Sequence, residues 1–471
     1  MERRAFLRAS AAGLSLAGAT TISAVQAEPA AARQASYEPL GRVTVEAAAE
    51  AVVGDDGETA YLATTTGFAT VDVSDPTDPT VLAEHDVEIG GESLRNILDV
   101  SVDGDRLVVA GPANPDYEPM GVRCYDVSDP ADPTAVDEYA TTFHIHNCTL
   151  EGDLLFVAEN ESETDTNALA IFDVDGEITR IGSWSLLDHE PGWRDRPFLG
   201  RYLHDVSVQD DIAALPYWNA GTYLVDVSDP TDPEYVTHVA DTTLEAQRGI
   251  GYEDAVYGLP GNDHYAAVDD TGELLAVGRE AWATDGEPDR PGGIDLYDVS
   301  DPAAPVHRSS IDPPRTDDES HGGGRWTTSH NFDLRGDRLF SSWYQGGVKI
   351  HDISDPSDPE RLAWWRDPDE TGFWTARVAD PGETFIASST EAIPSTALEG
   401  ALYTFPIESG EQADPPSLRE SGPSNGSDGN GAGDDAASGD SIPGFTGLAA
   451  LAGGAAGLEW CRRRGNGNVQ D

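Results

Sequence analysis

Four histidines stand at the same place in four consecutive repeats of this 471-residue chain. Each comes just before a segment whose apolar residues alternate, and they are His146, His204, His264 and His330. If neighbouring repeats bring these positions together, the imidazole rings converge, and imidazole is a favoured ligand of zinc, copper, iron and nickel. The register therefore predicts a site for a divalent transition metal. Common descent of the repeats offers an alternative, in which each histidine makes the same structural hydrogen bond.

Polar residues follow three of these histidines directly: Asn147, Asp205 and Asn331. Successive side chains of a strand point to opposite sides. We therefore expect these three residues to support the site or the fold rather than to join the histidines.

Aromatic residues gather after the second strand of three repeats: Tyr217, Trp218, Trp282, Trp343 and Tyr344. Tyr and Trp offer a flat apolar face with a polar tip, which suits stacking on a sugar ring or a small planar ligand. The alternative is an aromatic plug between repeats. Long insertions at residues 183–203, 241–263 and 312–329 belong to the same face, and elongated loops on a rigid scaffold commonly carry function.

The elements that position these residues follow from an internal repeat. The segment GFATVDVSDPTDPTVL at Gly67 returns at Gly121, Gly221, Gly293 and Gly347, and degenerate copies begin at Ala168 and Gly400. Alternating apolar residues in each copy indicate a strand, and Ser-Asp-Pro indicates a turn, because Asp accepts a backbone hydrogen bond and Pro fixes φ. With the strand pair that precedes each copy, this gives four antiparallel strands in about 50 residues, seven times. The fold class is therefore all-β, a seven-bladed β-propeller.

The two ends of the repeat region predict how the ring closes. The seventh copy stops after Ile407 without a fourth strand, while residues 40–45 form one spare strand before the first copy. Pairing these two segments would close the last blade with the N-terminal strand and remove two exposed sheet edges.

These copies, FATVDVSDPTDP and its variants, resemble the LVIVD repeat family over residues 40–407. The resemblance implies a propeller that is extracellular and often anchored, and it implies little about activity. A propeller hosts enzymes and binding proteins alike, so function depends on a site.

Both ends of the chain look like targeting signals. Arg3 and Arg4 in a basic start, with small residues up to Ala27, resemble a twin-arginine export signal with cleavage after Ala27. At the other end, Pro443, Gly444 and Phe445 precede an apolar run and three arginines, which resembles the PGF-CTERM sorting signal. That resemblance implies cleavage by an archaeosortase and transfer to a lipid anchor, although Glu459 interrupts the apolar run.

The expected organisation has five parts: a signal peptide at 1–27, a linker at 28–39, the propeller at 40–410, an acidic Gly/Ser/Asp spacer at 411–441 and an anchoring tail at 442–471. The chain is thus expected at the cell surface, outside the cell, attached to the membrane only through its C-terminal anchor.

The composition is strongly acidic, with 86 Asp plus Glu against 28 Lys plus Arg. Molar salt shortens the Debye length to roughly 3 Å and screens the repulsion among these charges. The composition is therefore typical of a halophile protein, and we expect its folding to weaken in dilute buffer. Nucleic acid is excluded as an expected partner, because phosphate binding needs clustered Lys and Arg.

Three functional hypotheses remain open. The first is a surface propeller that binds a small molecule, glycan or envelope protein on its loop-rich face. The second is a metal-dependent hydrolase or oxidoreductase that uses the four histidines. The third is a purely structural envelope protein. No nucleophile set, phosphate loop or dinucleotide fingerprint is visible in the sequence, so whether the chain is an enzyme stays undecided.

Overall fold

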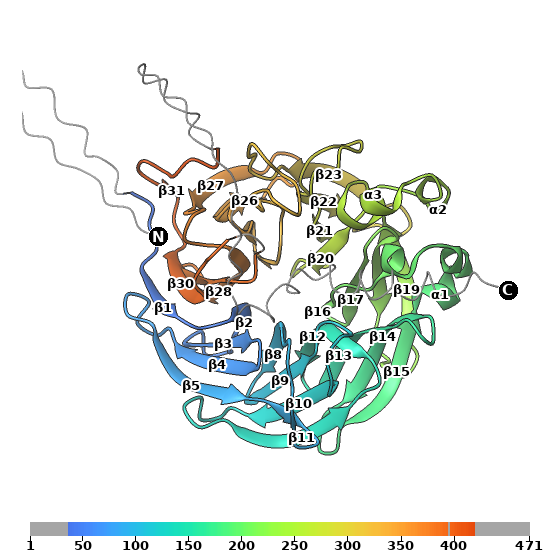
Figure 1. The fold of residues 1–471 in the computed structure, drawn as a ribbon, viewed down its shortest axis with the longest axis horizontal. Coiled ribbons are helices and arrows are strands. Elements are labelled where there is room, and N and C mark those ends of the chain that lie inside the picture. The colour runs from blue at the N-terminus through green and yellow to red at the C-terminus, as the bar shows by residue number, and fades with distance from the viewer. Residues whose placement is uncertain (1–35, 394–395, 420–471) are drawn as a thin grey trace, which may run out of the picture. The chain divides into compact units, whose positions relative to one another are not determined.

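The computed structural model describes residues 36–393 and 396–419, and these residues form seven antiparallel sheets around a central axis (Figure 1). The signal and sorting residues Arg3, Arg4, Ala27, Pro443, Gly444 and Phe445 lie outside the described residues. Each sheet is one blade of four consecutive strands, except that the last blade takes its fourth strand from the start of the chain. The predicted all-β, seven-bladed propeller is confirmed.

The strands of the seven blades follow each other from the innermost to the outermost. Blades 1 and 2 comprise β2 (Ala48–Val53), β3 (Thr59–Thr64), β4 (Gly67–Asp72) and β5 (Thr80–Asp86), then β8 (Asp99–Asp103), β9 (Arg106–Gly111), β10 (Gly121–Asp126) and β11 (Thr134–Ala140). Blades 3 and 4 comprise β12 (His144–Glu151), β13 (Leu154–Glu161), β14 (Thr166–Asp173) and β15 (Thr179–Ser185), then β16 (Ser207–Gln209), β17 (Ile212–Tyr217), β18 (Gly221–Asp226) and β19 (Glu234–Val239).

Blades 5 and 6 comprise β20 (Asp263–Val268), β21 (Leu274–Arg279), β22 (Ile294–Asp298) and β23 (Val306–Ile311), then β24 (Phe332–Arg335), β25 (Arg338–Ser342), β26 (Val348–Asp352) and β27 (Glu360–Trp365). Blade 7 comprises β28 (Phe373–Asp380), β29 (Thr384–Ser389), β30 (Ala401–Pro406) and β1 (Gly41–Thr44). A small hairpin, β6 (Glu88–Ile89) and β7 (Glu92–Ser93), leads into blade 2, and β31 (Gly410–Glu411) pairs in parallel with β27.

The few helices lie in two of the insertions. They are α1 (Leu186–His189), the 3-10 turns η1 (Pro191–Asp195) and η2 (Phe198–Arg201), α2 (Leu244–Gln247) and α3 (Tyr252–Tyr257). No helix in the described part of the chain has the length and apolar character that a membrane span needs.

The repeated Ser-Asp-Pro turn also joins neighbouring blades. The aspartate two residues before this motif accepts a hydrogen bond from the backbone N–H of its serine, as Asp72 does from Ser74 at 2.9 Å, which confirms the predicted turn. The proline carbonyl then accepts a hydroxyl hydrogen bond from the preceding blade. Three such bonds are Thr70 to Pro130, Ser309 to Pro356 and Thr404 to Pro76, at 2.6, 2.7 and 2.5 Å. One motif therefore ends a strand and attaches its blade to the next.

The spare N-terminal strand closes the ring as predicted. Strand β1 pairs antiparallel with β30, with Gly41 opposite Thr404 and Thr44 opposite Ala401. Gly41 is required there, because a Cβ at this position would lie 2.6 Å from the carbonyl oxygen of Pro76. Folded structure extends past the boundary expected at 410: Leu418 is buried, and the Pro416 carbonyl accepts a hydrogen bond from Arg366.

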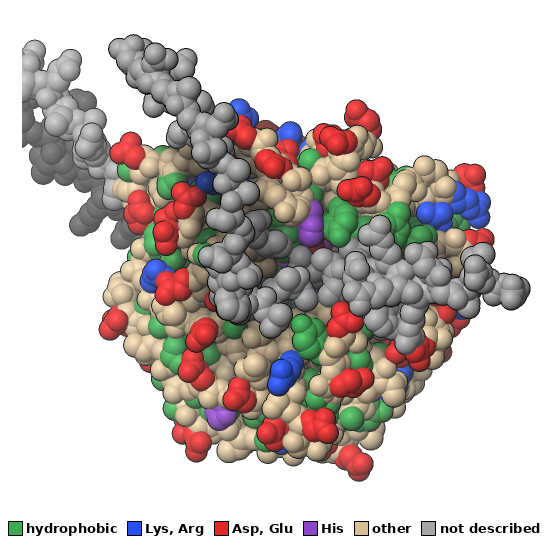
Figure 2. Space-filling model, in the orientation of Figure 1, with side chains coloured by type: hydrophobic (Ala, Val, Ile, Leu, Met, Phe, Trp, Pro, Cys, Tyr) green, Lys and Arg blue, Asp and Glu red, His purple; other side chains and the backbone are tan. Residues whose placement is uncertain are grey.

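The described surface is rich in acid, and Asp and Glu side chains are scattered over the face drawn in Figure 2, with few Lys and Arg between them. On this face the distribution accords with the composition.

Closure by β1 leads to a prediction for the ring as a whole. Deleting residues 28–46 should leave β30 with an unpaired edge, so the protein should lose its sharp melting transition and aggregate. Calorimetry and size-exclusion chromatography measure both effects. Arg42→Ala is the matched control, because it leaves the backbone pairing of β1 in place and removes only a partly exposed ion pair with Glu399 and a contact with the Tyr403 ring. It should change the free energy of unfolding by about 1 kcal/mol. A deletion variant as stable and monomeric as the parent would contradict the role of β1.

Candidate functional site

The innermost strands carry irregular registers at the predicted site. The pairing of β12 with β13 shifts between Ile145 and Cys148, and that of β20 with β21 shifts between Asp263 and Tyr265. An extra residue in a strand bends it and redirects a side chain, and such bulges recur next to functional sites. His146 and His264 are the residues that these bulges redirect.

Equivalent positions of the seven blades form one layer across the channel, which we name the histidine layer. Its members are Ala49, Leu98, His146, His204, His264, His330 and Trp374, and all are at most 5% exposed. The ring centroids of His146 and His204 are 4.2 Å apart, those of His204 and His264 3.8 Å, and those of His264 and His330 4.4 Å. The structure therefore brings the four predicted histidines together in one continuous row.

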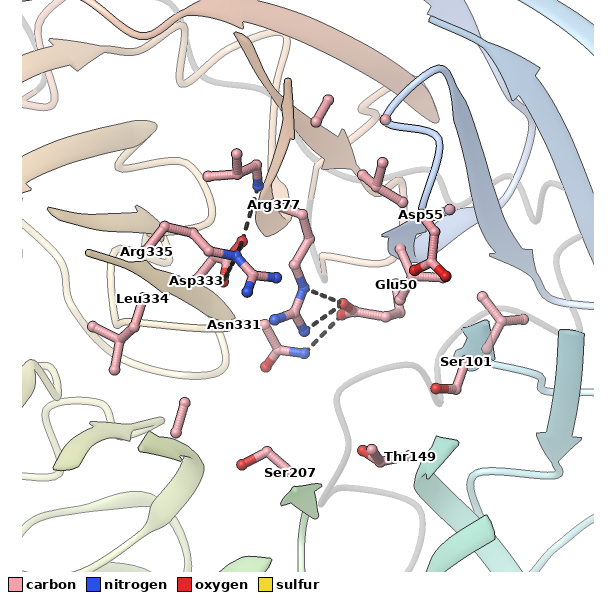
Figure 3. Close-up of a pocket in the computed structure, with 18 of the residues that line it drawn as sticks. Glu50, Asp55, Ser101, Thr149, Ser207, Asn331, Asp333, Leu334, Arg335 and Arg377 are labelled. Carbon is pink, nitrogen blue, oxygen red and sulfur yellow. Dashed lines mark hydrogen bonds and ion pairs between the residues drawn. The ribbon is translucent and has the colours of Figure 1, made fainter. Parts of the chain in front are cut away.

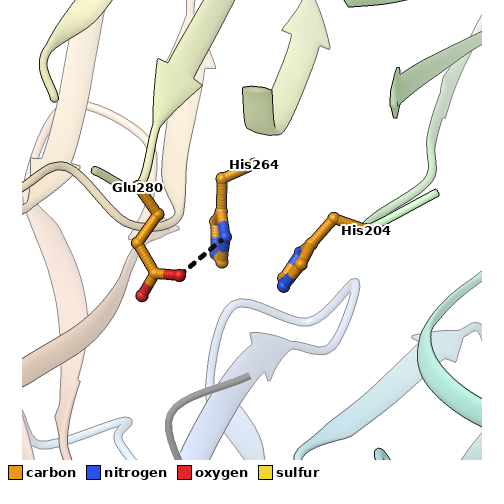
Figure 4. A group of neighbouring side chains, drawn as sticks. All are labelled: His204, His264 and Glu280. Carbon is orange, nitrogen blue, oxygen red and sulfur yellow. Dashed lines mark ion pairs between the residues drawn. The ribbon is translucent and has the colours of Figure 1, made fainter. Parts of the chain in front are cut away.

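Two of these histidines face a carboxylate that the sequence reasoning missed. Nδ1 of His264 lies 3.3 Å from Oε2 of Glu280, which follows β21 (Figure 4). Among the described residues, His204, His264 and Glu280 are the one group of His, Cys, Asp and Glu whose ligand atoms all lie within 4.8 Å of one another. His146 and His330 flank this group without belonging to it.

The flanking histidines have fixed orientations. His146 directs Nδ1 at the carbonyl of Ala113 and His330 directs Nδ1 at that of Trp374, at 3.3 and 2.6 Å. A carbonyl only accepts, so Nδ1 carries the proton and Nε2 keeps its lone pair. By contrast, neither ring nitrogen of His204 or His264 makes a hydrogen bond of standard geometry, although all four nitrogens are buried.

Burial keeps most of the histidine layer neutral. Burial and the neighbouring His264 lower the pKa of His146 to about 4, and they hold the pKa values of His204 and His330 well below the ordinary value. Burial alone would raise the pKa of Glu280, but the adjacent His264 outweighs it and that pKa falls to about 2. His146, His204 and His330 thus offer unprotonated imidazole nitrogens near one ionised carboxylate, and imidazole and carboxylate together are a donor set of transition-metal sites.

The five predicted aromatic residues are all buried, and they separate into two groups. Trp218, Trp282 and Tyr344 lie next to the histidine layer: Trp218 stacks on His204, Tyr344 packs on His330, and Trp282 packs on Trp326. Trp218 and Tyr344 have φ of 22° and 47°, a left-handed backbone that non-glycine residues adopt mainly where the surroundings impose it.

The other two aromatic residues belong to the interior of blades. Tyr217 packs on Trp184 and Tyr223, and Trp343 lies under the ammonium of Lys349, 3.9 Å from its ring centroid. All five residues are at most 5% exposed, so this burial favours the aromatic plug over stacking on a ligand from solvent.

The residues one position further along the same strands line a cavity on the opposite side of the histidine layer. We name it the carboxylate cavity; it has a volume of about 680 Å³, and its inner wall includes Glu50, Asp99, Asn147, Asp205 and Asn331. Its mouth lies among the turns between first and second strands, such as residues 54–58 and 380–384. Asn147, Asp205 and Asn331, which were expected to be supporting residues, thus line a space of their own.

Charges on the cavity wall are unevenly matched. Arg377 donates to Glu50 Oε1, to the Tyr265 hydroxyl and to the Phe332 carbonyl, and Asn331 donates to Glu50 Oε2 (Figure 3). Burial and the nearby Glu50 raise the pKa of Asp99 to about 8. Burial and Asp99 raise the pKa of Asp205 well above its ordinary value. Glu50 is therefore ion-paired with Arg377, whereas within the described residues the two aspartates feel Arg377 only at longer range and form no ion pair.

The geometry above defines a seven-bladed β-propeller with a closed, histidine-rich centre. The LVIVD repeat profile matches residues 56–86 and 200–241, so the chain is a β-propeller that contains LVIVD repeats. Among solved structures it is similar to the β-propeller domain of Cps50 (Swd1) from Myceliophteria thermophila, at 11% identity and a TM-score of 0.53, over 79% of this chain and 99% of that chain. At this identity the likeness concerns the fold alone. No curated protein matches the chain.

Asp99 gives a prediction for pH dependence. Its carboxyl is protonated in the folded state up to about pH 8 and ionises near pH 4 once unfolded. Its contribution to stability is therefore complete below pH 4 and is lost as the pH rises towards 8, at about 1.4 kcal/mol per pH unit. Asp99→Asn removes this titration while an oxygen remains to accept the N–H of Cys148.

Denaturant unfolding at constant salt, between pH 5 and 8, tests this. The free energy of unfolding of the parent should fall relative to that of Asp99→Asn as the pH rises. Glu50, Asp205 and Arg377 also face Asp99, but they are present in both proteins. Parallel pH curves would show that Asp99 does not titrate in this range.

Proposed function

We propose that this propeller holds one divalent transition metal ion at His204, His264 and Glu280. The observation that carries the proposal is the set of four buried imidazole nitrogens of His204 and His264, none with a hydrogen bond of standard geometry, of which Nδ1 of His264 lies 3.3 Å from Glu280. A buried polar atom without a partner costs on the order of 1–3 kcal/mol. Bonds to a metal would satisfy the nitrogens that face the carboxylate.

The surroundings of the three ligands favour a closed site. His204, His264 and Glu280 are 1%, 2% and 7% exposed, and the Tyr344 hydroxyl donates to the second carboxylate oxygen of Glu280. Catalytic zinc sites keep one position open to water or substrate, whereas structural sites do not. The ion would therefore join blades 4 and 5 at the channel, and this closure supports a structural metal over a hydrolase or oxidoreductase.

A direct measurement of metal content tests the proposal. Full-length protein, purified without chelator, should contain about one transition-metal ion per chain by plasma mass spectrometry, because one group of three ligands is present. His204→Ala combined with His264→Ala should abolish the metal, and Glu280→Gln should reduce its occupancy. Chelation should lower the melting temperature but leave the β-rich circular dichroism spectrum, since the blade pairing does not depend on the ion.

His307→Ala is the matched control, because His307 lies on the outermost strand of blade 5 with a side chain that is 48% exposed. It should retain the full metal content. A metal-free parent protein, or a double variant that keeps its metal, would refute the site.

We further propose that the propeller is exported through the twin-arginine route and anchored at the cell surface. The targeting motifs at both ends support this. Its loop-rich face, built by residues 183–203, 241–263 and 312–329, is the surface on which a small molecule, glycan or envelope protein would bind. Two of these insertions contain the short helices of the structure, so these parts of the face have a defined backbone conformation.

Mass spectrometry of surface protein tests the targeting proposal. The mature chain should begin near Glu28 and lack everything after about Pro443. Replacing Pro443, Gly444 and Phe445 together should leave an unprocessed form that retains its arginine-rich tail. Recovery of the peptide around Arg462 from mature material would defeat the sorting claim.

A further inference from the structure

The carboxylate cavity holds acidic groups whose burial sets them apart from the acidic surface. Nine carboxylates and two arginines are among the described residues that line it. Those at the mouth, such as Asp55 and Glu383, resemble the rest of the surface and mark no site by themselves. Glu50, Asp99 and Asp205 differ, because they are 2%, 4% and 3% exposed at the inner end.

Two oxygens on this inner wall are buried without a hydrogen-bond partner: Oδ2 of Asp205 and Oδ1 of Asn331. Both residues line the cavity. The amide oxygen of Asn331 can only accept a hydrogen bond, and the same holds for the carboxylate oxygen of Asp205 when that residue is ionised. Native proteins rarely leave such atoms unsatisfied. The two oxygens therefore point to a ligand that donates hydrogen bonds.

The two arginines that line the cavity already have partners. Arg377 is bound to Glu50, Tyr265 and Phe332, and Arg335 pairs with Asp333 at 3.3 Å. Glu50 is ion-paired with Arg377. Asp99 and Asp205 form no ion pair within the described residues, so in their ionised forms they would lack a countercharge of their own. A ligand at the inner end would therefore be a cation.

The spacing of the carboxylates decides between a metal ion and a molecule. No three carboxylates of the described cavity wall place their oxygens within 4.8 Å of one another, so they do not surround one ion directly. The volume of about 680 Å³ falls within the range of small-molecule sites, about 300–1,000 Å³. One molecule with several hydrogen-bond donors could reach carboxylates of the cavity wall that are too far apart to bind a single ion together.

We propose that the carboxylate cavity is a second binding site, separate from the histidine layer, which takes a small organic cation with primary ammonium groups. Asp99 and Asp205 receive the ammonium hydrogens, and Asn331 accepts a further hydrogen bond. The acidic mouth raises the local concentration of cations and steers them inward. The ligand enters at the turns between first and second strands, such as residues 54–58 and 380–384, where the cavity has its mouth.

Isothermal titration calorimetry with putrescine and spermidine on the full chain tests this site, with CaCl₂ as a separate arm for an inorganic cation. The titrations are run in molar KCl, since salt at this strength screens nonspecific attraction to the acidic surface but acts less on a buried site. We expect saturable binding of at least one amine with a stoichiometry of about one.

Two variants remove the site in different ways. Asp205→Asn should weaken amine binding at least about tenfold, which corresponds to about 1.4 kcal/mol. Ala267→Lys leaves every carboxylate in place, but it adds a tethered ammonium to the cavity wall and should abolish binding by occupying the site. The matched control is Asp188→Asn, whose side chain is 84% exposed and lies outside the cavity wall; it should bind as the parent does.

Melting temperatures of all variants establish that they are folded. Saturable amine binding that both cavity variants lose and the control keeps would support the proposal. Binding of calcium without either amine, absence of all binding, or equal weakening in Asp188→Asn would each overturn it. The metal content of Ala267→Lys should equal that of the parent, so failure of this site is distinguishable from failure of the metal site.

Discussion

The pairing of β1 with β30 sets the position of every innermost strand, because it turns seven successive sheets into a ring. Each blade also attaches to its neighbour through the Ser-Asp-Pro turn, whose proline carbonyl accepts a hydroxyl from the preceding blade. Equivalent residues of a closed ring must meet at its axis. The contact of four histidines from four blades is a consequence of closure, since in an open array of the same blades these residues would have no common neighbour.

A strongly acidic chain faces different constraints at its surface and in its interior. Surface carboxylates repel one another, but water and salt screen that repulsion. A buried charge needs a partner of its own. Arg377 supplies it to Glu50, and Lys349, the one lysine of the chain, is held between Trp343 and Trp364. Burial lowers the pKa of this lysine to about 7, so its interior position is compatible with a neutral amine. Asp99 and Asp205 are buried in the cavity wall without an ion pair of their own among the described residues.

The repeat predicted the blade number, the closure and the shared register of the histidines, because each of these follows from strand periodicity and from counting strands. It did not predict Glu280. Counting across the hairpin of β20 and β21 from the pair Val268 and Leu275 places Glu280 opposite Asp263, whereas the bulge at His264 shifts it to Asn262. Strand counting alone therefore does not show that the carboxylate of Glu280 lies 3.3 Å from the imidazole of His264. The different surroundings of Tyr217 and Trp218 were also not predicted. Trp218 has a φ of 22°, and the sequence does not reveal this local backbone conformation, which accompanies the separation of the two adjacent side chains. The boundary at 410 was placed too early, since polar composition alone does not show that Leu418 finds a buried position.

Consecutive residues in or just before the innermost strands explain how two different chemistries share one channel. His204 and Asp205 are consecutive, yet one belongs to the histidine layer and the other to the carboxylate cavity. Imidazoles stay neutral when buried and suit a transition metal, whereas carboxylates keep their charge only when a cation or a hydrogen-bond donor is near. Because the seven innermost strands share one register, the channel contains one layer that includes the imidazoles and a second layer that includes the carboxylates. The cavity has its mouth among the turns between first and second strands. A ligand there would meet only the carboxylate layer, and the metal ligands would remain shielded behind it.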